Sequence, residues 1–147
     1  MRKRKLFLFG SSLGSVVILK AMSEGLVADG AILDMPFGSL HDHLQGRARA
    51  LGFPEEPFGA LVTLWTGIEK GYNGFRHKTA RYAAKVQQPV LLQWGERDPY
   101  VSREEISTIY EAIPTKQKKL VVYQQGGHES LLYRDALKWR TEVSSFF

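Results

Sequence analysis

Short apolar runs of strand length alternate along the chain with longer segments in which apolar residues recur at helical spacing. The runs Leu6 to Phe9 and Gly30 to Asp34 are the first two, and the second contains no polar alternation. Such a run is typical of a strand that is buried on both faces of a parallel sheet. The runs Pro89 to Trp94 and Lys119 to Tyr123 have the same character. The pattern predicts an α/β fold with a mostly parallel sheet of about four strands.

The segments between these strands predict flanking helices. One runs from Leu13 to about Ser23, and its apolar run Val16 to Leu19 indicates a largely buried helix. Ser102-Arg103-Glu104-Glu105 has the sequence of a capping box, which predicts a helix that Pro114 ends. In the last segment, apolar residues spaced three and four apart predict the buried face of a final helix: Leu132, Ala136, Trp139, Val143 and Phe146.

Residues 38–85 interrupt the alternation of strand and helix. The pattern there is mostly helical but is broken by many glycines and prolines, which predicts an inserted cover over one end of the sheet. Aromatic residues of this cover either line an apolar pocket or form the cover's own small core: Trp65, Tyr72, Phe75 and Tyr82. Residues 1–147 as a whole are expected to form a single domain.

Composition narrows the class of protein. Of the 147 residues, 44% are hydrophobic and 24% charged, which suits one globular domain with its own core. The chain has no cysteine, which excludes disulfides, thiol nucleophiles and thiolate metal sites. No nucleic-acid motif accompanies the net charge of +5, and no apolar run reaches the roughly eighteen residues of a membrane span. Neither a nucleic acid nor a membrane is therefore an expected partner.

The first twenty residues have two interpretations. The basic run Arg2 to Lys5, followed by Leu6 to Leu19, imitates the charged and apolar regions of a secretory signal peptide. Two glycines and three serines interrupt the apolar part, however, and no clear small-x-small cleavage site follows. These interruptions favour a strand and a helix of a cytoplasmic protein.

A candidate nucleophile lies between the first strand and the first helix. Gly10-Ser11-Ser12-Leu13-Gly14 matches the G-x-S-x-G pattern of a nucleophile elbow. Gly10 and Gly14 remove side chains where strand and helix crowd together, so that Ser12 can hold a strained backbone with its hydroxyl above the sheet. The motif alone is also compatible with an ordinary turn rich in glycine and serine.

Three further polar residues, Asp34, Asp98 and His128, each follow an apolar strand. Because ligands bind outside the carboxyl ends of parallel strands, these side chains and Ser12 are expected at one edge of the sheet. A serine hydroxyl needs a base in reach, and the base needs a partner that fixes its tautomer. We predict Ser12 as nucleophile, His128 as base and Asp98 as its partner. Asp34 is the alternative acid, although Asp-x-Pro also simply turns the chain.

His41 and His43 flank Asp42 and imitate a metal site. No third ligand with a clear spacing accompanies them, and this pattern is more typical of a solvated helix edge. No metal and no cofactor is expected.

Four segments resemble landmarks of the α/β-hydrolase family: Phe9 to Gly14, Leu33 to Phe37, Pro89 to Val101 and Gly126 to Glu129. The resemblance extends from Leu6 to Phe147 and is nearest to bacterial esterases and peptidase-like hydrolases. It implies a serine hydrolase that acts on a small-molecule ester, thioester or amide through an acyl-enzyme. It also implies that the backbone N–H of Leu13 belongs to the oxyanion hole.

Members of this family usually have several strands before the elbow strand, whereas here only the basic run precedes Leu6. The sequence therefore predicts a truncated fold in which one of the two oxyanion donors has no counterpart. The strand Leu6 to Phe9 then lies at an edge of the sheet, which predicts a homo-oligomer or a partner that supplies an N-terminal half. The alternative function is a weak or inactive remnant, or an interaction subunit, that another chain completes.

Overall fold

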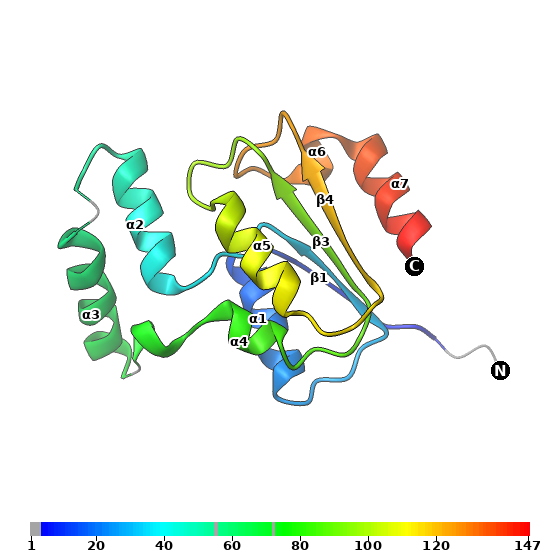
Figure 1. Cartoon of the computed structure of the whole chain (residues 1–147), viewed down its shortest axis with the longest axis horizontal. Helices are drawn as coiled ribbons and strands as arrows, with labels where there is room; N and C mark the ends of the chain where they lie inside the picture. The colour runs from blue at the N-terminus through cyan, green and yellow to red at the C-terminus, as the bar shows by residue number, and fades with distance from the viewer. Residues whose placement is uncertain (1–3, 55, 72) are drawn as a thin grey trace.

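A computed structural model describes residues 4–54, 56–71 and 73–147. In this part of the chain one sheet contains four strands, all parallel: β1 (Phe7–Ser11), β2 (Gly30–Asp34), β3 (Val90–Gly95) and β4 (Lys118–Tyr123). The strands lie in sequence order, so β1 and β4 are the two edges of the described sheet (Figure 1). The predicted parallel α/β fold is confirmed.

Helices cover both faces of the sheet. On one face lie α1 (Leu13–Ser23), α4 (Thr79–Ala83) and α5 (Arg103–Ala112), which Figure 1 shows in front of the strands. The opposite face carries α7 (Ala136–Phe146), where the Trp139 ring packs edge-on against Phe9 at 5.5 Å. None of the described helices combines the length and the apolar character that a membrane-spanning helix requires.

The two central strands form the core. Every residue of β2 and of β3 is buried, as the unalternating apolar runs predict. The helix α5 begins with the predicted capping box, because the Ser102 side chain accepts the Glu105 N–H while the Glu105 carboxylate accepts the Ser102 N–H. This cap holds α5 next to the loop that follows β3.

Two predictions about helix burial are wrong. The final segment forms two helices, α6 (Leu131–Arg134) and α7, because the Asp135 side chain accepts the Lys138 N–H and starts a new helix. Ala136 is exposed, and the other predicted core residues of this segment are only half-buried. In α1, Val17 is 56% exposed, because this face of the helix points away from the sheet.

The predicted cover consists of α2 (Leu40–Ala50), α3 (Phe58–Lys70), a short 3-10 helix η1 (Gly74–Arg76) and α4. Figure 1 shows α2 and α3 side by side, projecting from one end of the sheet. A Cβ atom on Gly46 would lie 2.5 Å from the Tyr100 carbonyl oxygen, so α2 packs closely on the loop after β3. This close approach places the cover beside the carboxyl ends of the strands.

The aromatic residues of the cover do not share one role. Tyr82 lines a groove beside α1, whereas Phe75 is 43% exposed and lines a separate depression at the end of α3. Trp65 is 68% exposed and therefore belongs to neither a pocket nor a core. Tyr72 lies outside the described residues.

Candidate active site

The turn from β1 into α1 is strained at Ser12. Its backbone has φ 52° and ψ −116°, a region that residues with a side chain rarely adopt. The Ser12 N–H donates to the Asp34 carbonyl oxygen at 2.7 Å, and the Ser15 hydroxyl donates to the carbonyl oxygens of Gly10 and Asp34. The end of β2 therefore holds the strained turn in place.

The two glycines of the elbow differ in their surroundings. A Cβ atom on Gly10 would lie 2.6 Å from the Gly14 carbonyl carbon and 2.8 Å from Ile18 Cδ1, so this position requires glycine. A Cβ atom on Gly14 would meet no described atom within 4 Å apart from its chain neighbours and the backbone of its own helix. The expectation that strand and helix crowd together at both glycines is correct for Gly10 and wrong for Gly14.

Ser12, His128 and Asp98 lie within hydrogen-bond distance of one another in that order. His128 Nε2 is 3.0 Å from Ser12 Oγ, and His128 Nδ1 is 2.6 Å from Asp98 Oδ2. An ionised carboxylate accepts only, so Nδ1 carries the proton that it donates to Asp98. In this tautomer Nε2 has a free lone pair, which faces the Ser12 hydroxyl.

Asp98 is held by the loop that follows β3. Its Oδ1 atom accepts the backbone N–H groups of Tyr100 at 2.8 Å and Val101 at 3.0 Å, and its side chain is fully buried. One carboxylate oxygen is thus occupied by the loop, which leaves Oδ2 for His128. His128 itself is 12% exposed and reaches the solvent-accessible side of the site.

Asp34, the alternative acid, belongs to a different network. Its carboxylate oxygens accept hydrogen bonds from Gln93 Nε2 at 3.0 Å and Trp139 Nε1 at 3.2 Å, and the Tyr123 hydroxyl donates to Gln93 Oε1 at 2.7 Å. Burial raises the pKa of Asp34 to about 6, although both donors oppose the shift. Burial also raises the pKa of the Tyr123 hydroxyl. Asp98, rather than Asp34, is the carboxylate within hydrogen-bond distance of His128.

His43 of α2 lies beside these residues, which the sequence alone does not indicate. Its ring stacks on Phe37 with centroids 4.4 Å apart and lies 6.2 Å from the His128 ring. Arg47 Nε donates to His43 Nε2 at 3.0 Å, so the proton of the neutral ring is on Nδ1. Burial lowers the pKa of His43 to about 4. The expectation of a solvated helix edge is therefore wrong for His43.

The environment of His43 is unusual because its Nδ1 atom is buried and has no hydrogen-bond partner among the described residues. His41, two residues earlier, lies near different groups, with Nε2 3.1 Å from Glu56 and Nδ1 3.4 Å from Thr63 Oγ1. The two histidines thus do not converge on one point. The described part of the chain contains no group of three His, Asp or Glu side chains arranged as metal ligands.

A largely apolar groove of about 470 Å³ begins next to the elbow. It runs along the exposed face of α1, and its lining residues come from that helix and from the cover: Leu13, Val16, Val17, Lys20, Phe37, Leu40, His77, Thr79 and Tyr82. The backbone N–H of Leu13 lies in the first turn of α1, where the helix itself supplies no acceptor. One bound molecule could therefore place an apolar group in the groove and a negatively charged oxygen at the Leu13 N–H.

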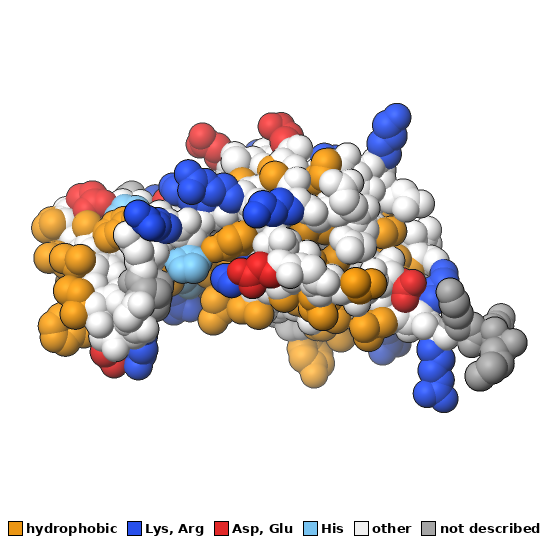
Figure 2. Space-filling view, turned by 90° about the horizontal axis from the view of Figure 1, so that it is seen from below, with side chains coloured by type: hydrophobic (Ala, Val, Ile, Leu, Met, Phe, Trp, Pro, Cys, Tyr) orange, Lys and Arg blue, Asp and Glu red, His pale blue; other side chains and the backbone are white. Residues whose placement is uncertain are grey.

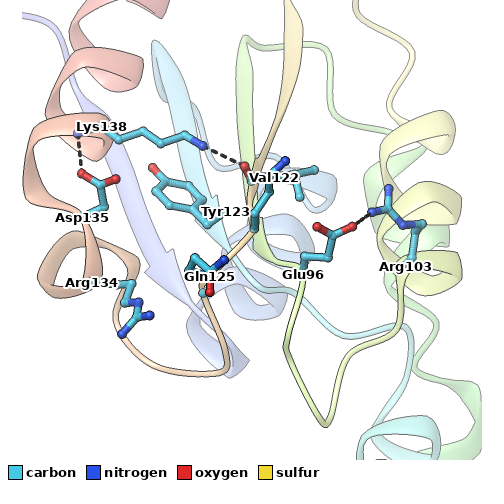
Figure 3. A pocket seen from close by; sticks show the side chains of 10 residues that line it. Glu96, Arg103, Val122, Tyr123, Gln125, Arg134, Asp135 and Lys138 are labelled. Atoms are coloured by element: carbon cyan, nitrogen blue, oxygen red, sulfur yellow. Dashed lines mark hydrogen bonds and ion pairs between the residues drawn. The ribbon is translucent and has the colours of Figure 1, made fainter.

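A larger pocket of about 810 Å³ lies around the carboxyl end of β4 (Figure 3). Its lining is polar, and its charged groups already have partners, since Arg103 pairs with Glu96 and Lys138 Nζ donates to the Val122 carbonyl oxygen at 2.8 Å. Neither Ser12 nor His128 lines it. Size alone therefore does not identify the site, and the apolar groove is the one lined by Leu13, the residue that follows Ser12 in the chain.

Comparisons with known proteins bear on the family and on the fold. The family model described as serine aminopeptidase, S33, matches residues 70–135, which include Asp98 and His128 but not Ser12. No curated protein matches the chain.

Several solved structures share the fold. An esterase of Pyrococcus furiosus, Pf2001, is 21% identical with a TM-score of 0.75 over 97% of this chain and 53% of its own. A monoacylglycerol lipase of Paleococcus ferrophilus is 19% identical with a TM-score of 0.63 over 97% of this chain and 68% of its own. Acetyl xylan esterase 1 of Thermoanaerobacterium sp. is 16% identical with a TM-score of 0.64, over 98% of this chain and 46% of its own. The chain spans about half the length of the first structures that it matches.

Proposed function

We propose that this chain, which has the fold of the α/β-hydrolases, is a serine hydrolase that cleaves small-molecule esters, thioesters or amides. The observation that carries the proposal is the hydrogen-bonded series from Ser12 Oγ through the His128 ring to Asp98 Oδ2, with distances of 3.0 and 2.6 Å. The strained backbone of Ser12 adds support, because strain of this kind persists where it positions a reacting group.

The first half of the reaction forms an acyl-enzyme. Ser12 Oγ attacks the carbonyl carbon while His128 Nε2 takes the hydroxyl proton, and Asp98 stabilises the resulting imidazolium. The negative charge moves to the carbonyl oxygen, which the Leu13 N–H stabilises. The tetrahedral intermediate then collapses, the bond to the leaving group breaks, and His128 gives its proton to that group.

The second half regenerates the serine. Water attacks the acyl carbon and gives a proton to His128 Nε2, and a second tetrahedral intermediate forms at the same oxyanion position. The bond to Ser12 Oγ breaks, His128 returns the proton to Oγ, and the carboxylic acid leaves. Every proton that the reaction needs passes through one nitrogen atom, His128 Nε2.

Two observations support an ester with an apolar acyl group as the substrate class. The groove offers about 470 Å³ of mostly apolar space, and Leu13, which follows the nucleophile in the chain, lines it. The similar structures include two esterases and a monoacylglycerol lipase by name.

A fluorophosphonate probe tests the proposal, because it reacts covalently with activated serines. We expect the folded chain to be labelled and the Ser12→Ala variant not to be labelled. Ser11→Ala is the matched control, since Ser11 is an exposed neighbour in the same turn and should leave labelling unchanged. Labelling that persists in Ser12→Ala contradicts the assignment of the nucleophile.

The second candidate function is that of an interaction subunit whose site another chain completes. It rests on the outer edge of β1, which pairs with no strand among the described residues, and on the adjacent exposed side chains of α1, where Leu13 is 61% and Val17 56% exposed. A correctly folded chain that is not labelled by the probe favours this function over the first.

A further inference from the structure

The helix α3 presents its large apolar residues to solvent and its small residues to the protein. Thr63 is fully buried, and Gly59 and Gly67, four residues to either side, are also buried. A Cβ atom on Gly59 would lie 2.7 Å from Gln45 Cγ of α2, so this small face packs closely on the neighbouring helix. The arrangement is the reverse of an ordinary surface helix, whose apolar face points inward.

The outward face of α3 is a continuous apolar stripe. Leu61, Trp65 and Ile68 are 60%, 68% and 70% exposed, and Phe58 and Leu64 extend the same surface. Phe53, in the loop before α3, stacks on Phe58 with ring centroids 5.6 Å apart and widens it. Figure 2 shows hydrophobic side chains gathered at the end of the molecule where Figure 1 places α3.

The spacing along this stripe is that of a helix that packs against another helix. Phe58, Leu61, Trp65 and Ile68 are three, four and three residues apart, which is the a and d spacing of paired helices. The set is also symmetric about position 63. An antiparallel second α3 with its two-fold axis at that position would bring Phe58 against the partner's Ile68 and Leu61 against the partner's Trp65.

We propose that the outward face of α3 is an interface between two copies of this chain, packed antiparallel across a two-fold axis. Together with the two α2 helices behind them, the paired α3 helices form a four-helix layer outside both sheets. The surface is separate from the β1 edge, so this contact and any contact through the edge are independent.

The charges around the stripe favour a second copy over a lipid surface. Glu56 lies just before α3 and Lys70 at its end, with exposed side chains, and Glu69 pairs with Lys70 at 3.0 Å. The same antiparallel register brings Glu56 to the end of the helix at which the partner's Lys70 lies. An anionic membrane would attract the lysine but repel both glutamates, whereas the two-fold arrangement places each Glu56 near the partner's Lys70.

The extent of the surface is also sufficient. Six large apolar side chains make up the stripe with Phe53, and each is 43–70% exposed: Phe53, Phe58, Leu61, Leu64, Trp65 and Ile68. Such a set supplies a substantial part of the roughly 800 Å² that each partner contributes to a standard interface. A monomer rarely leaves an apolar patch of this size uncovered.

Sedimentation velocity on the full chain at micromolar concentration tests the contact. Trp65→Glu places a charge in the centre of the interface and should weaken association on the order of a hundredfold, halving the mass of the assembly. Leu137→Glu is the matched control, because Leu137 lies on α7, is 80% exposed and should leave the assembly unchanged. An assembly that survives Trp65→Glu, or a wild-type chain that is monomeric, overturns the proposal.

Disulfide trapping tests the register. Because the chain has no cysteine, only the introduced cysteines can form a disulfide. Under mild oxidation the double variant Phe58→Cys/Ile68→Cys should form covalent dimers. Ten residues of helix separate the two positions by about 15 Å, so no disulfide forms within a chain, and either single variant should remain uncrosslinked in the antiparallel register. Crosslinking by the single variants instead, or none by the double variant, contradicts the proposed packing. A monomer that binds lipid vesicles through Trp65, seen as a blue shift of its fluorescence, would make a lipid surface the occupant.

Discussion

His128 Nδ1 lies 2.6 Å from Asp98 Oδ2, while the other oxygen of the same carboxylate accepts the N–H groups of Tyr100 and Val101. The loop after β3 therefore determines which oxygen of the Asp98 carboxylate faces the imidazole. An amide at position 98 would keep its oxygen on the two N–H groups and turn its NH₂ toward His128 Nδ1. The ring would then protonate on Nε2 and lose its ability to accept the Ser12 proton.

From this arrangement we predict that Asp98→Asn lowers kcat by about ten-thousandfold with little change in fold, as the wrong imidazole tautomer does in serine proteases. Asp34→Asn is the comparison, because the Asp34 carboxylate contacts Gln93 and Trp139 instead, and its effect on kcat should be below about tenfold. Steady-state kinetics with a p-nitrophenyl ester measure both. If Asp34→Asn had the larger effect, the acid of the site would be Asp34.

The two glycines of the elbow predict opposite effects on stability. In Gly10→Ala the new methyl group meets the backbone of Gly14 at 2.6 Å, and we expect a loss of about 1–3 kcal/mol or more in the free energy of unfolding. In Gly14→Ala the methyl group enters open space in a helix, where alanine is favoured by up to about 1 kcal/mol. Urea denaturation of the two variants measures the difference, and equal losses would show that the turn is packed differently.

Two buried groups predict opposite dependences of stability on pH. The pKa of Asp34 is raised to about 6 in the folded chain, so between about pH 4 and 6 the folded state binds more protons and stability falls as pH rises. The pKa of His43 is lowered to about 4, below its ordinary 6.5, so over that range the unfolded state binds more protons and stability rises with pH. In the wild-type chain the two effects partly cancel.

Single substitutions should expose each contribution. We predict that the free energy of unfolding of Asp34→Asn rises more steeply with pH than that of the wild type, by up to about 1.4 kcal/mol per pH unit between about pH 4 and 6. His43→Phe should show the reverse, a fall with rising pH in the same range. Denaturant titrations at several pH values measure both slopes, and parallel curves for the three proteins would mean that neither group is shifted.

Much of the fold follows from local pattern. The strands β2 and β3 could be predicted because residues buried on both faces leave an unbroken apolar run, and α5 because its capping box is a local signal. The break before α7 could not, because the three-and-four spacing of apolar residues continues through Asp135, which starts a second helix. The spacing of apolar residues indicates which side of a helix is buried. It does not reveal a break between two helices when the spacing continues across the break.

Part of the candidate site could likewise be predicted from the sequence and part could not. The proximity of Ser12, Asp98 and His128 could be predicted because each follows a strand of one parallel sheet, and parallel strands end at one edge. The place of His43 depends instead on how α2 packs on the loop after β3, through the close approach of Gly46 to Tyr100. No spacing between residues 43 and 128 carries that information, so the contribution of the cover became visible only in three dimensions.

The proposed reaction acylates Ser12, and the acyl-enzyme can be trapped and located. The chain is mixed with excess p-nitrophenyl acetate and quenched in acid within the first turnovers, and the acylated peptide is identified by mass spectrometry. We predict a burst of p-nitrophenol that approaches one per chain, with the acetyl group on the Ser12 peptide and neither burst nor acetyl group in Ser12→Ala. Undiminished release of p-nitrophenol by Ser12→Ala, or an acetyl group that remains in that variant, would show that Ser12 is not the nucleophile.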